Sequence, residues 1–344
     1  MNPSRVGYPQ VRGRGMRGRA WGIDAGGVNP ELGRVAVGQG GVVSRAQAIS
    51  AGYTPEQIRE RLSDGRWERV RRGQYAERVD LGRLEPWEQE LFRHRRLVHA
   101  AMNAMQPGSA VVSHHSALVL QRIPVWRADL AEVQLTRTNG RGEVKAGVRH
   151  HQGRLTPADL TQVAGLAVTS VPRAVVETAS TTSFEAAVVS IDAALRRPEV
   201  SAGELRRLLT VTDCWPGGPT IRLALAFADP LAESVGESRL RVLMHNEGLP
   251  PPVLQAVFED DAGFIGRVDF YFPDYNTVVE FDGLMKYADG SQYTLIQEKI
   301  REDRLRALGL QVVRLRWVDL AHPARTALAI RKAFDTSRRT RLAG

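Results

Sequence analysis

A stretch late in the chain, residues 267–283, constrains the fold most strongly because its residues alternate between polar and apolar. Strong strand formers fill its two halves, and Pro273-Asp-Tyr-Asn276 between them has the composition of a tight loop. The stretch therefore predicts a β-hairpin. With these four residues as the loop, Phe272 is expected to face Thr277 across the two strands.

This register places three carboxylates on one face of the hairpin. Asp269 lies opposite Glu280, and Asp282 falls on the same side because strand side chains alternate with a period of two. Carboxylates at this spacing repel one another, and a divalent cation with oxygen ligands removes the repulsion. We therefore expect these residues to bind Mg²⁺; alternatively, the hairpin is half-exposed and its polar face is merely acidic. The other face is expected to be apolar, with Val268, Phe270, Phe272, Val279 and Phe281.

The charge of the chain favours a nucleic acid as partner. Lys and Arg number 47 and Asp and Glu 38 among 344 residues, which gives a net charge of +9. Only four of the basic residues are Lys, and the fork of Arg binds phosphate with two hydrogen bonds. DNA is the expected partner, although a coding sequence rich in G and C would produce the same bias.

The remaining composition predicts a cytoplasmic protein without a membrane partner. No apolar run approaches the roughly 18–20 residues of a membrane helix, and the basic N-terminus lacks the apolar core of a signal peptide. The single cysteine, Cys214, cannot form an internal disulfide bond. Neither a phosphate-binding glycine loop nor a spaced Cys/His cluster is present, so nucleotide cofactors and structural zinc are not expected.

Residues 35–80 have the pattern of a winged helix. Ser44-Arg-Ala-Gln47 and Thr54-Pro-Glu-Gln57 are both capping boxes that start short helices, and Trp67–Ala76 reads as a hairpin with its bend at Gly73. A helix in the major groove with a basic wing on the backbone would bind DNA; alternatively, the unit is structural with a solvated basic face. The expected DNA contacts are Gln57, Arg59 and Arg61 on the second helix, and Arg69, Arg71 and Arg72 on the wing.

Three segments of this unit carry a family resemblance: residues 41–47, 51–54 and 65–75. They resemble the N-terminal winged-helix domain of the AbiEi family, the antitoxins of type IV toxin–antitoxin systems. The resemblance implies binding to promoter DNA and a toxin partner encoded nearby. Residues 84–228 are similar to the α/β region that follows in such proteins. In this region, His114-His115 and His150-His151 could together form a metal site; alternatively, these histidines pack in the core and form hydrogen bonds.

The C-terminal part is expected to run α-β-β-β-α-β. Together with the hairpin acids, this order resembles the restriction-endonuclease-like fold of the PD-(D/E)XK superfamily, and more closely a domain related to very-short-patch-repair endonucleases. The segments that carry the resemblance are residues 236–240, 267–270, 279–283, 299–304 and 309–317.

The resemblance implies metal-assisted phosphodiester hydrolysis. Asp269 and Glu280 would bind Mg²⁺, and Glu237 on the preceding helix would be a third acid. The superfamily usually has Lys two residues after the second acid, where this chain has Asp282. Lys286 and Lys299 are the lysines that could replace it; alternatively, Lys286 is a solvated loop residue and Lys299 forms a surface pair with Asp303.

The sequence thus predicts an α/β multidomain protein with two competing functions. The first is a DNA-binding, Mg²⁺-dependent endonuclease, and the second is a non-catalytic antitoxin or transcriptional repressor with a degenerate nuclease fold; a factor acting on RNA is a third. The expected segments are a disordered Gly/Arg-rich tail (1–34), the winged helix (35–80), the α/β middle domain (84–228), the restriction-endonuclease-like domain (229–322) and a basic C-terminal tail (323–344).

Overall fold

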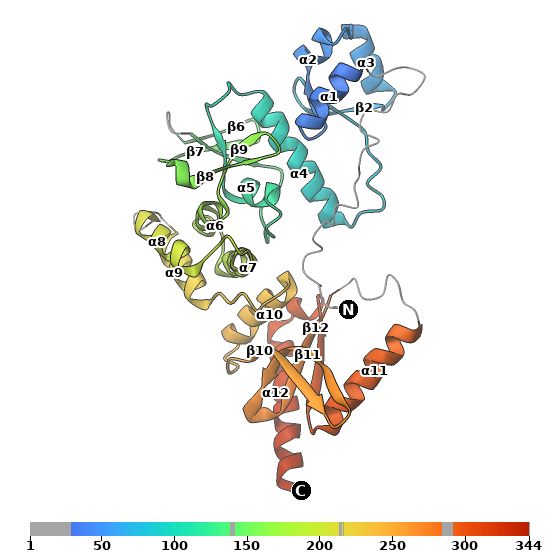
Figure 1. The fold of residues 1–344 in the computed structure, drawn as a ribbon, viewed down its shortest axis with the longest axis vertical. Coiled ribbons are helices and arrows are strands. Elements are labelled where there is room, and N and C mark those ends of the chain that lie inside the picture. Colours follow the sequence, from blue (N-terminus) through green and yellow to red (C-terminus); the bar gives the residue numbers. More distant parts are fainter. Residues whose placement is uncertain (1–28, 138–141, 213–214, 216, 284–291, 344) are drawn as a thin grey trace. The chain divides into compact units, whose positions relative to one another are not determined.

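The computed structural model describes residues 29–343 except 138–141, 213–214, 216 and 284–291 (Figure 1). These residues fall into two compact units. The N-terminal unit lies within Gln10–Ala187 and Val200–Arg222, and the C-terminal unit lies within Val188–Glu199 and Leu223–Gly344. Among the described residues, no helix is long and apolar enough to cross a membrane.

The first part of the N-terminal unit has three helices and a three-stranded antiparallel sheet in the order β1-β3-β2. Both capping boxes form as predicted, with Ser44 and Thr54 as N-caps. Trp67 is almost fully buried and lies between the rings of Tyr53 and Tyr75. The elements are α1 (Pro30–Gly38), β1 (Val42–Ser44), α2 (Arg45–Ser50), α3 (Pro55–Ser63), β2 (Trp67–Arg71) and β3 (Gln74–Glu77).

Helix α1 corrects the prediction that residues 1–34 are disordered throughout. Asn29 accepts a hydrogen bond from Glu31 N and caps the helix, and Pro30 occupies its first turn. Leu32 and Ala36 lie buried in the same core as Trp67. The helix forms because this apolar stripe completes the winged-helix core; residues 1–28 lie outside the described residues.

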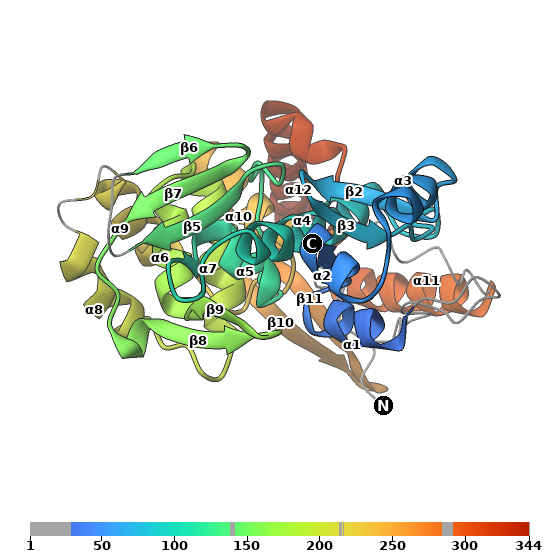
Figure 2. The ribbon, with the colours of Figure 1, turned by 90° about the horizontal axis from the view of Figure 1, so that it is seen from above.

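The second part of the N-terminal unit is built on a six-stranded mixed sheet in the order β6-β7-β5-β4-β9-β8. Figure 2 shows β6, β7 and β5 side by side. Helices α4, α5 and α6 pack near it, and α7 and α9 continue into the C-terminal unit. The elements are α4 (Pro86–Asn103), β4 (Val111–Val112), α5 (His114–Leu120), β5 (Val133–Arg137), β6 (Glu143–Lys145), β7 (Val148–Gln152), β8 (Leu160–Val163), β9 (Leu166–Thr169), α6 (Val171–Ala179), α7 (Phe184–Leu195), α8 (Ala202–Thr212) and α9 (Gly218–Phe227).

The C-terminal unit contains a four-stranded sheet in the order β10-β11-β12-β13, in which only β12 and β13 are parallel. One face packs against α10 and α12, and the other packs against α11. The elements follow one another as α10 (Val235–Asn246), β10 (Val253–Asp260), β11 (Gly263–Phe272), β12 (Thr277–Asp282), α11 (Gln292–Ala307), β13 (Gln311–Arg316) and α12 (Pro323–Ala343).

The predicted hairpin register is confirmed. Phe272 pairs with Thr277, and the short helix Pro273–Tyr275 with left-handed Asn276 makes the loop. One apolar residue was assigned to the wrong face: Val268 packs with Val278 on the α11 side, whereas Phe270 packs on the α10 and α12 side.

The reason for this exchange is a local interruption of both strands. Gln255 in β10 has a φ of +54°, a left-handed conformation that rotates the strand. Leu254 before it packs on one face of the sheet and Ala256 after it packs on the other. The partners of these two residues in β11 are Phe270 and Val268, so the strands change faces together at Asp269.

The C-terminal stretch 323–344 was expected to be a basic tail, but residues Pro323–Ala343 form helix α12. Ala327, Ile330 and Phe334 recur at helical spacing and are buried in the sheet core. The Phe334 ring lies 4.9 Å from that of Phe272. The many arginines of this stretch obscured its apolar stripe, which has only one residue per turn.

Candidate nucleic-acid interface and acidic centre

The two polar residues of α3 predicted to bind DNA are exposed but already have local partners. The Gln57 side chain accepts a hydrogen bond from Thr54 N at 2.9 Å and so belongs to the capping box. Arg59 forms an ion pair with Glu56 at 2.5 Å, and both side chains are about 70% exposed. Glu60 and Asp64 are also exposed, so α3 presents a face of mixed charge rather than a basic one.

Arg61, the third predicted contact on α3, is buried instead. It follows the core residue Ile58 by three positions and therefore lies on the inner face of the helix. Its guanidinium carbon lies 5.2 Å from the centre of the Tyr53 ring and 5.7 Å from that of Trp67. Such cation–π contacts stabilise the core, so Arg61 is not available as an exposed contact.

The hairpin of β2 and β3 carries the basic surface. Arg69 and Arg72 are exposed, and neither forms an ion pair with a carboxylate of the described residues. Arg45, which sequence reasoning missed, is also exposed, and its backbone N donates to Gly73 O at the bend. Arg71 differs from these residues because its Nη2 donates to Ala146 O at 2.7 Å. The exposed cations Arg45, Arg69 and Arg72 are called the wing cluster below.

In the C-terminal unit, Glu280 and Asp282 are buried and point towards α11. Arg314 is the direct neighbour of Glu280 in the parallel strand β13, so the two side chains share a face. Its guanidinium contacts four carboxylates: Glu302 at 3.0 Å, Glu298 and Asp282 at 3.5 Å, and Glu280 at 3.7 Å. These acids together raise the pKa of Arg314 against the lowering effect of burial.

A second arginine forms an ion pair with Glu280. Arg301 on α11 lies 2.6 Å from Glu280 Oε1, while Arg314 lies near the other oxygen. Glu280 is only 4% exposed, so an unpaired charge there would be costly. We call Glu280, Asp282, Glu298, Glu302, Arg301 and Arg314 the arginine–carboxylate network.

Asp269 and Glu237 form a separate pair of acids. Asp269 accepts a hydrogen bond from Phe281 N at 2.8 Å. Glu237 Oε2 accepts from Glu233 N at 2.9 Å and from the Gln255 amide at 3.0 Å. Burial, and then the charge of Asp269, raise the pKa of Glu237 to about 8, so its neutral form prevails at pH 7.

These contacts bear on the predicted magnesium ligands. Two arginines near Glu280, a backbone N–H at Asp269 and the raised pKa of Glu237 each reduce the repulsion that called for a cation. Within the described part of the chain, no three His, Cys, Asp or Glu side chains are grouped to hold a metal. Glu280 Oε2 is buried without a hydrogen-bond partner among the described residues, and magnesium binding by these acids stays a prediction.

Of the two lysines proposed to assist catalysis, Lys299 is not brought to these acids. Lys299 is 65% exposed and forms an ion pair with Asp303 at 3.2 Å, which is the surface alternative stated for it. Lys286 lies outside the described residues. No lysine of the described residues therefore contacts Glu280, and the cations that do so are arginines.

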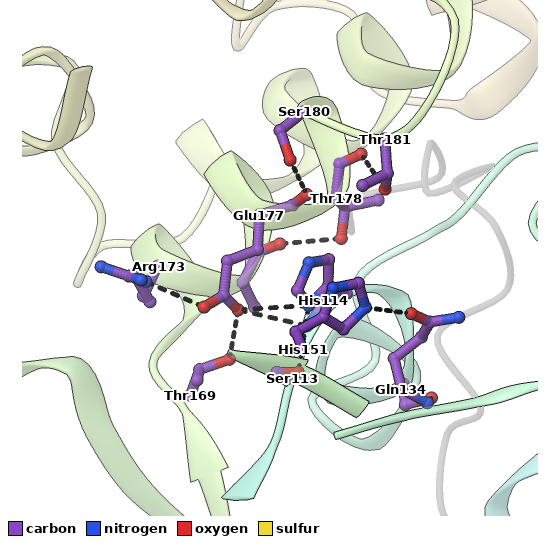
Figure 3. Close-up of polar contacts among 12 residues, drawn as sticks. Ser113, His114, Gln134, His151, Thr169, Arg173, Glu177, Thr178, Ser180 and Thr181 are labelled. Atoms are coloured by element: carbon purple, nitrogen blue, oxygen red, sulfur yellow. Dashed lines mark hydrogen bonds and ion pairs between the residues drawn. The ribbon is translucent and has the colours of Figure 1, made fainter. Parts of the chain in front are cut away.

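A buried polar network in the N-terminal unit was not predicted (Figure 3). Glu177 on α6 is 1% exposed. Its carboxylate accepts hydrogen bonds from Arg173 Nε at 2.8 Å, Thr169 Oγ1 at 3.1 Å and His114 N at 3.2 Å. His114 has a φ of +51°, and the bond to its N–H helps to hold this uncommon backbone conformation. The sequence did contain a signal for this network, because Arg173 and Glu177 are four residues apart in a mainly apolar helix.

The histidines of this region pack against one another and form hydrogen bonds, which the sequence also allowed as the alternative to a metal site. The rings of His114 and His151 stack with their centres 3.6 Å apart, and His151 Nε2 lies 2.5 Å from the Gln134 amide oxygen. Burial lowers the pKa of His114 well below its ordinary value and that of His151 to about 4. His94, fully buried between Leu130 O and Ser116 Oγ, likewise has its pKa lowered to about 4 by burial.

Comparisons with known proteins identify the winged-helix part. A family model described as "Transcriptional regulator, AbiEi antitoxin" matches residues 32–78. Two Mycobacterium tuberculosis proteins, named "Uncharacterized protein MT2308" (strain CDC 1551 / Oshkosh) and "Uncharacterized protein Rv2248" (strain ATCC 25618 / H37Rv), are similar over most of the chain. Each is 28% identical over 294 residues, which cover 85% of this chain and 100% of the relative. The family match confirms the predicted AbiEi resemblance, while the endonuclease resemblance stays a prediction.

The arginine–carboxylate network predicts a large stability cost for Arg314→Met. Four carboxylates would lose their shared cation, which should lower the free energy of opening around β12 by about 3 kcal/mol. Hydrogen exchange of the amides of residues 277–282 measures this opening, with exposed Arg316→Met as the control. Marked protection of wild-type β12 by Mg²⁺ would contradict the assignment, because it would mean that the acids prefer the metal.

Because these buried histidines are neutral, we expect the free energy of unfolding to decrease as the pH is lowered. His94 has a pKa of about 4 when folded and about 6.5 when unfolded. Unfolding therefore takes up a proton between these values, so stability is complete above pH 6.5 and declines as the pH falls towards 4. The slope should reach about 1.4 kcal/mol per pH unit for each such histidine.

Hydrogen exchange of residues 114–136, corrected for the intrinsic rate, at pH 7 and 5 tests this expectation. His94→Gln should be less stable at pH 7 but show a flatter dependence on pH, because it removes one titrating group. An unchanged slope in this variant would show that other groups cause the pH dependence.

Proposed function

We propose that this protein is a DNA-binding transcriptional regulator of the antitoxin type. The observation that carries the proposal is the winged helix at the residues that match the AbiEi antitoxin model. The exposed cations of its hairpin, Arg69 and Arg72, together with Arg45, would contact phosphates of the duplex. By the same resemblance, the partner protein would be a toxin encoded nearby.

The charges favour a wing-centred mode of binding. Helix α3 exposes Glu56, Glu60 and Asp64 beside Gln57 and Arg59, so close approach of its whole face to phosphates would be repulsive. Base contacts are expected to come from the first turn, where Gln57 can leave its capping bond to bind a base edge. Phosphate contacts from the wing cluster would set the position on the duplex, and the first turn of α3 would supply the sequence preference.

The C-terminal unit is then a non-catalytic module. Its element order, α-β-β-β-α-β, is the order predicted for the nuclease-like domain. Its buried acids, however, form ion pairs with Arg301 and Arg314. Arginine is always charged, and several ion pairs hold it in place here. It can therefore replace the charge of a metal ion, but it cannot bind and activate a water molecule as a metal does. We infer that the acids of this unit are structural.

The wing cluster predicts a specific defect in the double variant Arg69→Ala/Arg72→Ala. Loss of two phosphate contacts should weaken binding to duplex DNA at least about tenfold and lower the salt slope, d log K/d log [salt], by about 2. Fluorescence anisotropy would be measured on a duplex from upstream of the protein's own coding sequence and on a scrambled duplex of equal length.

The matched control for this experiment is Arg206→Ala/Arg207→Ala. These arginines are adjacent, exposed and on α8, so the control removes the same charge from another surface. Equal losses in the two double variants would show that only net charge matters. Wild-type protein that fails to bind either duplex would overturn the proposal.

Plasmid nicking separates this proposal from the endonuclease alternative, which stays a prediction. With Mg²⁺ present, supercoiled plasmid should remain intact with wild type and with Asp269→Ala. Metal-dependent nicking by wild type that Asp269→Ala abolishes would support the enzyme instead. DNA affinity measured on the same two preparations ensures that a negative result does not come from unfolded protein.

A further inference from the structure

Helix α12 of the C-terminal unit exposes a concentration of positive charge. Among its described side chains, those of residues 323–340, five basic residues are exposed, against one exposed acid, Asp335. The inner side is fixed to the sheet by the buried stripe that contains Phe334, whose ring also stacks on Tyr275 with centres 4.0 Å apart. The outer side is therefore held towards solvent by packing. The five basic residues are Arg325, Arg331, Lys332, Arg338 and Arg339.

These cations differ from six other arginines of the unit in their partners. Six arginines elsewhere in the unit form ion pairs with carboxylates, namely Arg241, Arg267, Arg301, Arg304, Arg306 and Arg314. On α12, by contrast, none of the five basic residues forms an ion pair with a carboxylate of the described residues. Arg331 donates to Glu247 O, and Arg338 lies over the Tyr275 ring at 5.0 Å. Arg325, Lys332 and Arg339 are left facing solvent.

Those three cations form a ridge along the helix. They are seven residues apart, close to two full turns, so they lie nearly on one line. The ridge spans 14 residues, or about 21 Å at 1.5 Å per residue. A duplex carries one phosphate per about 1.7 Å of its axis, so a length of this size passes about a dozen phosphates.

Helix stability alone does not explain the ridge. Cations near the C-terminus interact favourably with the helix dipole, which accounts for Arg339 and Arg338. Arg325, however, occupies the first turn of α12, where a positive charge is unfavourable, and Lys332 lies in the middle. A phosphate ligand gives a reason for positive charge at all three positions.

We propose that Arg325, Lys332 and Arg339 form a second DNA-binding surface, which contacts phosphates of duplex DNA. This inference rests on the proposed function and extends it to the C-terminal unit. The ridge consists of cations alone and has no uncharged polar side chains suited to hydrogen-bond base edges. Its contacts are therefore expected to add affinity without sequence preference. The wing cluster would set the position on the duplex, and the ridge would add phosphate contacts of its own.

The test is the triple variant Arg325→Ala/Lys332→Ala/Arg339→Ala in the full chain. Binding to the upstream duplex and to the scrambled duplex should weaken by the same factor, at least about tenfold, and the salt slope should fall by about 2 to 3. Alanine at exposed helical positions favours the helix, and circular dichroism would verify that the variant is folded.

A matched control, Arg154→Ala/Arg206→Ala/Arg207→Ala, removes three exposed arginines from the N-terminal unit. Unchanged DNA binding by the ridge variant, with the wing variant still defective, would overturn this inference and leave the proposed function intact. A loss limited to the upstream duplex would also overturn it, because phosphate contacts do not distinguish sequences. Loss of binding to RNA or anionic vesicles with unchanged DNA binding would assign the ridge to another polyanion and overturn it too.

Discussion

The C-terminal unit depends on the neutralisation of Glu280 within a sheet that buries it. Strand β12 has a partner on each side, and all six of its residues are buried, including two acids on the α11 face. Arg314 is held beside Glu280 by the parallel pairing, and Arg301 reaches it from α11. Helix and sheet are thereby joined by charge as well as by the apolar contacts of Leu305 and Val278. A position that would suit a metal is instead stabilised by guanidinium groups.

A similar principle shapes the N-terminal unit, where buried polar groups are paired rather than excluded. Glu177 receives three hydrogen bonds from different segments, and Arg173 supplies the compensating charge. Arg61 packs over two aromatic rings in the winged helix. Arg173 and Arg61 are therefore buried and do not contribute to the surface charge. The number of arginines in the sequence accordingly overstates how basic the surface is. Exposed cations without an ion pair to a described carboxylate remain on several elements; the functional proposals concern the wing cluster and α12, which each hold three or more of them.

Local patterns made much of the architecture predictable. Both capping boxes formed at Ser44 and Thr54 because each depends on residues three positions apart. The register of the β11–β12 hairpin followed from loop length and alternation. Of the predicted DNA contacts, Arg59, Arg69 and Arg72 are exposed cations as expected. Four other predicted site residues could not be placed from sequence because their surroundings come from distant segments: Arg61 in a core, Arg71 on a neighbouring loop, and Glu280 and Asp282 beside Arg314.

The sequence by itself determined the winged helix, the hairpin register and the excess of positive charge, since these depend on near neighbours or on composition. Only the tertiary structure decided which charges are paired. Arg314 lies 34 residues from Glu280 along the chain, and their contact exists because β13 returns parallel to β12 after α11. It also decided that the last 21 residues before the terminus form a helix, because Phe334 finds a core only after the sheet has assembled. An acid's role depends on the cation that folding brings to it, and spacing along the chain does not specify that cation.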